Sequence, residues 1–237
     1  MALPKLGYPT FELELPSTGK TIKYRPFLVK EEKVLLMALE SKDEKQVVSA
    51  VKDLIKNCVI TRIKVDNLPS FDLEYLFLKI RGASIGENII LTVTCLDDNE
   101  TQVEANININ DVEIFKPEGH DKKIMFDENT GLVMKYPSMK EFVDREFLQK
   151  EMKTEDVYEF IADSIDQIFD SEEVYDSSTT TKKEFRTFVD SLTTKQFEKI
   201  QKFYETSPKL SHTFKVTNPK TGKESSYTIE GLQSFFA

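Results

Sequence analysis

The sequence predicts an α+β fold that is mainly helical and carries three β-hairpins, one N-terminal, one central and one C-terminal. Two patterns predict this class. Apolar residues recur every three to four positions within the segments 30–80 and 138–204, as on one face of an amphipathic helix. Elsewhere, short stretches alternate apolar and polar residues on both sides of turn-forming residues. The 237 residues, 39% hydrophobic and 31% charged, suffice for one large or two small globular domains.

The first hairpin is predicted in residues 11–25. Residues 11–15 alternate apolar and acidic side chains, and residues 20–25 resume a strand-like pattern. Between them, residues 16–19 (Pro-Ser-Thr-Gly) have the composition of a tight turn. Pro26 then ends the hairpin, because proline has no backbone N–H to donate to a strand ladder.

Three helices are predicted to follow. The first covers residues 30–39, and its apolar residues form one broad surface: Val34, Leu35, Met37 and Ala38. The second begins at a capping box, in which the side chains of Ser41 and Glu44 bond free backbone amides of the first turn. The third begins at Ser70. The apolar residues at helical spacing in these last two helices are Val47, Val48, Val51, Leu54, Ile55, Cys58, Phe71, Tyr75, Leu76, Leu78 and Ile80.

The apolar period changes to two after Asn88, which predicts the central hairpin. Residues 89–95 and 102–109 read as its strands, and the acidic residues 97–99 read as its turn. The segment 124–135 is compatible with a further small hairpin.

After Pro137 the chain is predicted to be helical and strongly acidic. Residues 137–176 contain four basic and thirteen acidic residues, a net charge of −9, which equals that of the whole chain. A helix that opens at Thr154 is expected to place the following residues on one face: Val157, Phe160, Ile161, Ile165, Ile168 and Phe169. Capping boxes mark three helix starts, at Ser138 and Glu141, Thr181 and Glu184, and Thr193 and Gln196.

The C-terminal hairpin is predicted from residues 212–216 and 226–229, joined by a turn at residues 218–222. The composition shift at Pro137 is the best candidate for a domain boundary. We therefore expect an N-terminal domain of residues 1–136, and an acidic helical domain of residues 137–237 that ends in the C-terminal hairpin.

The charge of the chain bears on its partners. A duplex-binding protein needs a basic face to displace counterions from phosphates, and a net charge of −9 argues against one. The same charge disfavours an anionic membrane surface, and no early apolar run approaches the roughly 20 residues of a membrane span. We expect no nucleic-acid partner, no membrane insertion and no signal peptide. The two cysteines, Cys58 and Cys95, are expected to be free thiols in a reducing cytoplasm.

The sequence offers little material for catalysis or for a cofactor. The segments 16–20 and 219–223 lack the spacing of a phosphate-binding loop and read as turns. His120 and His212, the only histidines, are expected at exposed structural positions. The acidic residues after Cys95 disfavour its thiolate, and the acidic turn at 97–100 lacks the spacing of an EF-hand loop. We therefore expect no enzymatic activity, no cofactor and no metal site.

Three blocks of the sequence resemble a known family. The first, residues 15–38, is the most specific and reads LPSTGKTIKYRPFLVKEEKVLLMA. The second is residues 73–87, followed by the cysteine-bearing central hairpin, and the third runs from Phe197 to the closing Phe-Phe pair at residues 235–236. Together they make the chain similar, over nearly its whole length, to baseplate hub assembly proteins of T-even-like contractile-tailed bacteriophages. Relatives often carry paired cysteines in the central and C-terminal hairpins; with only Cys95 in these hairpins, a four-cysteine zinc site is not expected.

The resemblance implies a non-catalytic factor that binds immature hub subunits in the host cytoplasm during virion assembly. The alternative is a permanent structural subunit of the baseplate hub in the virion tail, for which self-association would be expected. In both cases the implied partners are other baseplate hub and tail proteins. The residues that we expect to contact a partner are Tyr24, Arg25, Pro26, Phe27, Leu232, Phe235 and Phe236. For both groups, packing within the chain's own core stays open as the other interpretation.

Overall fold

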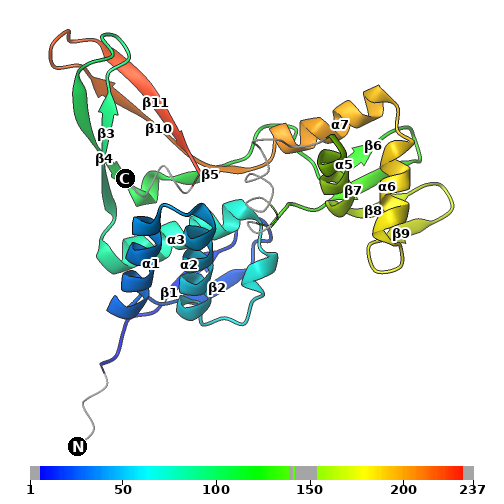
Figure 1. Cartoon of the computed structure of the whole chain (residues 1–237), viewed down its shortest axis with the longest axis horizontal. Coiled ribbons are helices and arrows are strands. Elements are labelled where there is room, and N and C mark those ends of the chain that lie inside the picture. Colours follow the sequence, from blue (N-terminus) through cyan, green and yellow to red (C-terminus); the bar gives the residue numbers. More distant parts are fainter. Residues whose placement is uncertain (1–5, 139–140, 142–153, 232–237) are drawn as a thin grey trace, which may run out of the picture. The chain divides into compact units, whose positions relative to one another are not determined.

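The computed structural model describes residues 6–138, 141 and 154–231, and the chain forms two compact units (Figure 1). Unit 1 consists of residues 1–115 together with 209–237, and unit 2 consists of residues 116–208. The chain therefore leaves unit 1 once and returns to it. This division differs from the expected boundary at Pro137, which lies within unit 2, and it places the C-terminal hairpin in unit 1.

The N-terminal part of unit 1 is a hairpin covered by helices. The predicted hairpin is present as β1 (Phe11–Glu14) and β2 (Thr21–Tyr24), paired antiparallel. The three predicted helices follow as α1 (Val29–Ser41), α2 (Glu44–Cys58) and α3 (Ser70–Ile85). Their shared core consists of Leu15, Ile22, Leu35, Val51, Leu54, Ile55, Phe71, Leu76, Phe77 and Ile80.

The start of α2 differs from the prediction. Ser41 belongs to the last turn of α1, and Lys42 takes a left-handed conformation with φ of 54°. Asp43 is consequently the N-cap, and its carboxylate accepts from the backbone N–H groups of Lys45 and Gln46. The predicted capping box of Ser41 and Glu44 is therefore wrong, because α1 extends far enough to include Ser41.

The C-terminal part of unit 1 consists of two small antiparallel sheets. The central hairpin, β3 (Asn88–Thr94) and β4 (Gln102–Asn108), forms one of them. In the other, β10 (Lys209–Thr217) lies between β11 (Glu224–Glu230) and the unpredicted three-residue β5 (Glu113–Phe115). Alternate residues of these strands fill a common core with Leu78 of α3: Ile89, Leu91, Ala105, Ile107, Leu210 and Val216.

Unit 2 combines one four-stranded sheet with helices. Its antiparallel strand order is β6 (Lys123–Met125), β7 (Gly131–Met134), β8 (Ile165–Phe169) and β9 (Val174–Asp176). The described residues of unit 2 form the helices α5 (Thr154–Asp163), α6 (Lys182–Asp190) and α7 (Thr194–Glu205). Sheet and helices share a core that includes Leu132, Met134, Ile161, Ile165, Phe185, Val189, Ile200 and Phe203. The capping boxes of Thr181 and Glu184 and of Thr193 and Gln196 are confirmed, as is that of Ser138 and Glu141.

The expectation of a mainly helical fold is wrong. The described residues form eleven strands in four sheets beside six helices, which is an α+β fold without a helical majority. The largest difference is in the acidic segment, where α5 ends at Asp163 and Ile165 begins β8 instead of continuing the helix. Ser164 closes the last turn of α5, since its hydroxyl and its N–H both donate to Phe160 O. Ile165 and Ile168 suit a strand because their β-branched side chains pack well on a pleated surface.

Candidate interaction surfaces

The four predicted contact residues at the end of the first hairpin lie mostly in the core. Tyr24, Arg25 and Phe27 are 6%, 8% and 8% exposed, and Pro26 is half-buried. The Phe27 N–H donates to Ser84 Oγ at 2.9 Å, which fixes this segment to the end of α3. These side chains therefore stabilise unit 1 and leave little surface for a partner.

Arg25 is the centre of a buried polar cluster. Its Nη2 lies 3.1 Å from Glu31 Oε1 and donates to Asn57 O at 2.9 Å, so it links β2 to α1 and α2. Burial alone would raise the pKa of Glu31, but the hydrogen bonds from Arg25 and from the Leu28 N–H lower it below its ordinary value. Burial also raises the pKa of the Cys58 thiol to about 11, so this cysteine is a poor nucleophile.

The C-terminal contact residues Leu232, Phe235 and Phe236 lie outside the described residues. The last described residue, Gly231, donates its N–H to Leu210 O at 3.0 Å in unit 1. The role of these three residues as partner contacts stays a prediction.

Helix α1 carries apolar side chains in the core and on its exposed surface. Glu31, Leu35 and Ala38 are buried in unit 1. Four further apolar residues are exposed, by 78%, 53%, 52% and 60% respectively, and we call them the α1 outer surface: Val29, Val34, Leu36 and Met37. The sequence predicted one broad apolar surface from Val34 to Ala38, and the structure divides it between core and solvent. Exposed apolar groups of this kind are candidate interaction sites.

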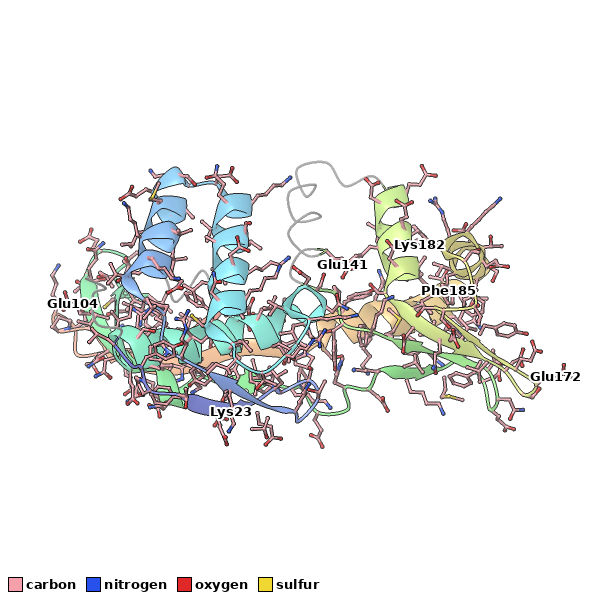
Figure 2. All side chains as sticks on the ribbon, turned by 90° about the horizontal axis from the view of Figure 1, so that it is seen from below. Lys23, Glu104, Glu141, Glu172, Lys182 and Phe185 are labelled. Atoms are coloured by element: carbon pink, nitrogen blue, oxygen red, sulfur yellow. The ribbon has the colours of Figure 1, made fainter. Side chains whose placement is uncertain are left out.

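The hairpin of β8 and β9, which we call the acidic hairpin, lies at one edge of the unit 2 sheet. Residues 165–176 contain five carboxylates and no lysine or arginine. Glu172 lies at the tip of this hairpin (Figure 2). Val174 and Tyr175, in β9, are 61% and 39% exposed. The hairpin therefore combines negative charge with exposed apolar area.

Among the described strands, β9 has a neighbour on one side only. It is the last strand of its sheet, and Ile168 in β8 is paired with Tyr175. Asp170 N donates to Glu173 O, and Ser177 N donates to Asp166 O. Because alternate residues of an antiparallel strand bond in opposite directions, the backbone N–H and C=O of Val174 face away from β8. An extended peptide could bond to them by strand addition.

The turns of the central and C-terminal hairpins are joined by hydrogen bonds, which we call the hairpin clasp. Asn218 Nδ2 donates to Asp97 Oδ1 at 2.9 Å and to Asp98 Oδ2 at 3.0 Å, and Thr221 Oγ1 donates to Asp97 Oδ2. Tyr227 OH adds a bond to Thr94 O at 2.8 Å. The carboxylates of the turn at Asp97 thus bond to the C-terminal hairpin. From the sequence, this turn had been considered as a possible cation ligand.

Cys95 lies at the end of β3 beside the clasp and is 2% exposed. Burial first, and then the carboxylates of Asp97 and Asp98, raise the pKa of its thiol. The sequence had predicted that the acidic residues would disfavour the thiolate. Among the residues that the structure describes, no group of three His, Cys, Asp or Glu side chains is placed to hold a metal ion.

His120 is buried, which corrects the expectation of an exposed position. Its ring is 7% exposed and stacks on Tyr136 and Phe203 in unit 2. Nδ1 lies 2.9 Å from Thr206 Oγ1, which itself donates to Lys202 O, so Nδ1 carries the proton and Nε2 accepts from Tyr136 OH. His212 is half-buried, with Nδ1 3.1 Å from Asp111 O.

Comparison with known proteins identifies a family. A family model described as T4 bacteriophage base plate protein matches residues 8–237, which covers both units. No curated protein and no solved structure matches the chain. In the part of the chain that the structure describes, no helix has the length and apolar composition needed to cross a membrane.

Proposed function

The chain belongs to the T4 bacteriophage base plate protein family, and from this premise we propose that it is a non-catalytic assembly factor of the baseplate hub. In this role it binds immature hub subunits in the host cytoplasm, as a chaperone does, while the virion tail is assembled. Its partners are other hub and tail proteins.

The observation that carries this proposal is the acidic hairpin. Five carboxylates in a segment that contains no lysine or arginine attract a basic partner over several ångströms and raise the rate of encounter. The exposed side chains of Val174 and Tyr175 can then be buried in the complex, and the free edge of β9 can add backbone hydrogen bonds. Strand β9 has only three residues, which suits the small, reversible interface of an assembly factor.

The test is a charge reversal at the tip of the hairpin. Tagged wild-type protein and the Glu172→Lys variant are recovered from infected cells, and the hub proteins that accompany them are quantified by mass spectrometry. We expect the variant to recover several-fold less of the hub proteins. The matched control is Glu104→Lys, because Glu104 is also an exposed carboxylate of a β-hairpin, in strand β4 of unit 1 (Figure 2). Equal loss in both variants, or no loss in either, would contradict a role for the acidic hairpin.

A second candidate function is a permanent structural subunit of the hub. The α1 outer surface favours it, because four side chains that are each more than half exposed offer more apolar area than the acidic hairpin does. Apolar interfaces of this kind are typical of lasting assemblies. The amount of the chain in mature particles separates the two candidates.

A further inference from the structure

Exposed charged residues of α1 alternate with apolar residues of the α1 outer surface. With 3.6 residues per turn, Val29, Lys33, Leu36 and Glu40 lie along one line on the helix, and all four are exposed. Met37 lies beside this line. The order along the helix is therefore apolar, positive, apolar, negative.

Lys33 and Glu40 cannot satisfy each other within one helix. They are seven residues apart, which corresponds to about 10 Å along the axis. Neither forms an ion pair with another residue of the described chain. A complementary surface would have to present a negative charge near Lys33 and a positive charge near Glu40.

A second copy of α1, running antiparallel, has this arrangement. If a two-fold axis passes between Leu36 and Met37, Lys33 of each copy lies opposite Glu40 of the other, since both residues are three and a half positions from the axis. Leu36 and Met37 of the two copies then face each other at the centre. We propose that the α1 outer surface is a self-association site, through which two copies of this chain pair antiparallel about a two-fold axis.

Two physical features favour a second copy over an unrelated helix. The charge pattern is complementary to itself only in the antiparallel direction, as the isologous contact of a two-fold dimer requires. Apolar residues occupy the centre of the contact and charges flank it, which is the usual anatomy of an interface. A single 13-residue helix presents a small area, so the dimer is expected to be weak and concentration-dependent. This inference goes beyond the proposed function and does not depend on the acidic hairpin.

The test is sedimentation equilibrium of the full-length chain and its charge variants. We expect the wild type to show a reversible monomer–dimer equilibrium. Lys33→Glu and Glu40→Lys each place like charges opposite one another twice in the dimer, and should raise the dissociation constant about tenfold. The double variant Lys33→Glu/Glu40→Lys restores both pairs and should return the constant to near the wild-type value. Leu36→Asp should leave only monomer, and Glu104→Lys, away from α1, should change nothing.

All these side chains are exposed, so the variants should keep the wild-type circular dichroism spectrum, which checks folding. A wild type that stays monomeric at every attainable concentration would overturn the proposal. A dimer that the single reversals do not weaken, or that the double variant does not restore, would also overturn it. The sedimentation results for the α1 variants do not bear on the pull-down with Glu172→Lys. The self-association site and the proposed function are therefore tested independently.

Discussion

Asn218 donates its side-chain amide to Asp97 across the turns of two hairpins that are about 120 residues apart in the chain. The amide is buried, with Asn218 only 1% exposed, and its Oδ1 accepts from the Lys220 N–H at 2.9 Å. One side chain thus fixes its own turn and the turn of the central hairpin. The two hairpins consequently behave as one part of unit 1.

Asn218→Ala should lower the free energy of unfolding by about 2 kcal/mol, because it removes a buried amide whose hydrogen bonds to Asp97, Asp98 and the Lys220 N–H hold the two turns together. Urea unfolding monitored by circular dichroism measures the change. The control is Asn106→Ala, which removes an exposed amide from the outer face of β4. Equal effects of the two substitutions would argue against the hairpin clasp as a stabilising contact.

Arg25→Met should destabilise unit 1 more strongly, by about 3 kcal/mol, since it removes the buried cation that bonds Glu31 and leaves only the exposed Lys30 beside this buried carboxylate. Lys23→Met is the matched control, because Lys23 forms an ion pair of the same 3.1 Å length with Glu12 but at the surface (Figure 2). Exposed pairs contribute little, so this variant should resemble the wild type in urea unfolding. If Arg25→Met were as stable as Lys23→Met, Arg25 would be free for another role, including the predicted contact with a partner.

His120 should make unit 2 sensitive to mild acid. Burial lowers the pKa of its ring below the ordinary value, and the charges of Lys116 and Lys122 lower it further. Asp121 acts in the opposite direction but does not outweigh them. Between the folded pKa and about 6.5, the unfolded chain binds a proton that the folded chain does not, so stability is lost as pH falls through this window. The melting temperature of the wild type should drop from pH 7.5 to pH 5.5 more than that of His120→Gln. The same drop in both proteins would refute this role of His120.

Two glycines should respond in opposite directions to alanine. A Cβ at Gly131 in β7 would lie 2.5 Å from Ile124 O and 2.7 Å from Phe169 Cζ, so Gly131→Ala forces backbone and ring apart. A Cβ at Gly82 in α3 would make ordinary contact with Ile109 at 3.5 Å. Gly82→Ala should therefore raise the melting temperature, by adding a helix-favouring residue, and Gly131→Ala should lower it. A stabilising Gly131→Ala would contradict the pairing of β6, β7 and β8.

Local patterns predicted most of the elements. The turn at residues 16–19, with alternating apolar and polar residues on both sides, correctly predicted the hairpin of β1 and β2. The capping boxes at Thr181 and Thr193 correctly predicted the starts of two helices. These signals depend on neighbours within a few residues, which a sequence displays directly. The expectation for Ile165 and Ile168 was wrong because their place in β8 depends on pairing with β7, about thirty residues earlier.

The candidate surfaces were harder to predict. The apolar residues of α1 point to core and to solvent alike, and nothing in their spacing distinguishes Leu35, which is buried, from Leu36, which is exposed. From the sequence, Arg25 could equally be a surface residue that contacts a partner or a residue packed within the chain. The sequence does not show that Arg25 bonds to Glu31 and to Asn57 O. The sequence shows the negative charge of residues 165–176. Only the structure shows that these residues form one hairpin at the edge of a sheet.

The most direct test of the proposed function is the copy number of the chain in purified mature particles, measured by quantitative mass spectrometry against its abundance in hub assembly intermediates. An assembly factor is released, so we predict that the chain is abundant in the intermediates and absent from mature particles. A fixed, whole-number stoichiometry in mature particles would contradict this and identify the chain as a permanent subunit of the baseplate.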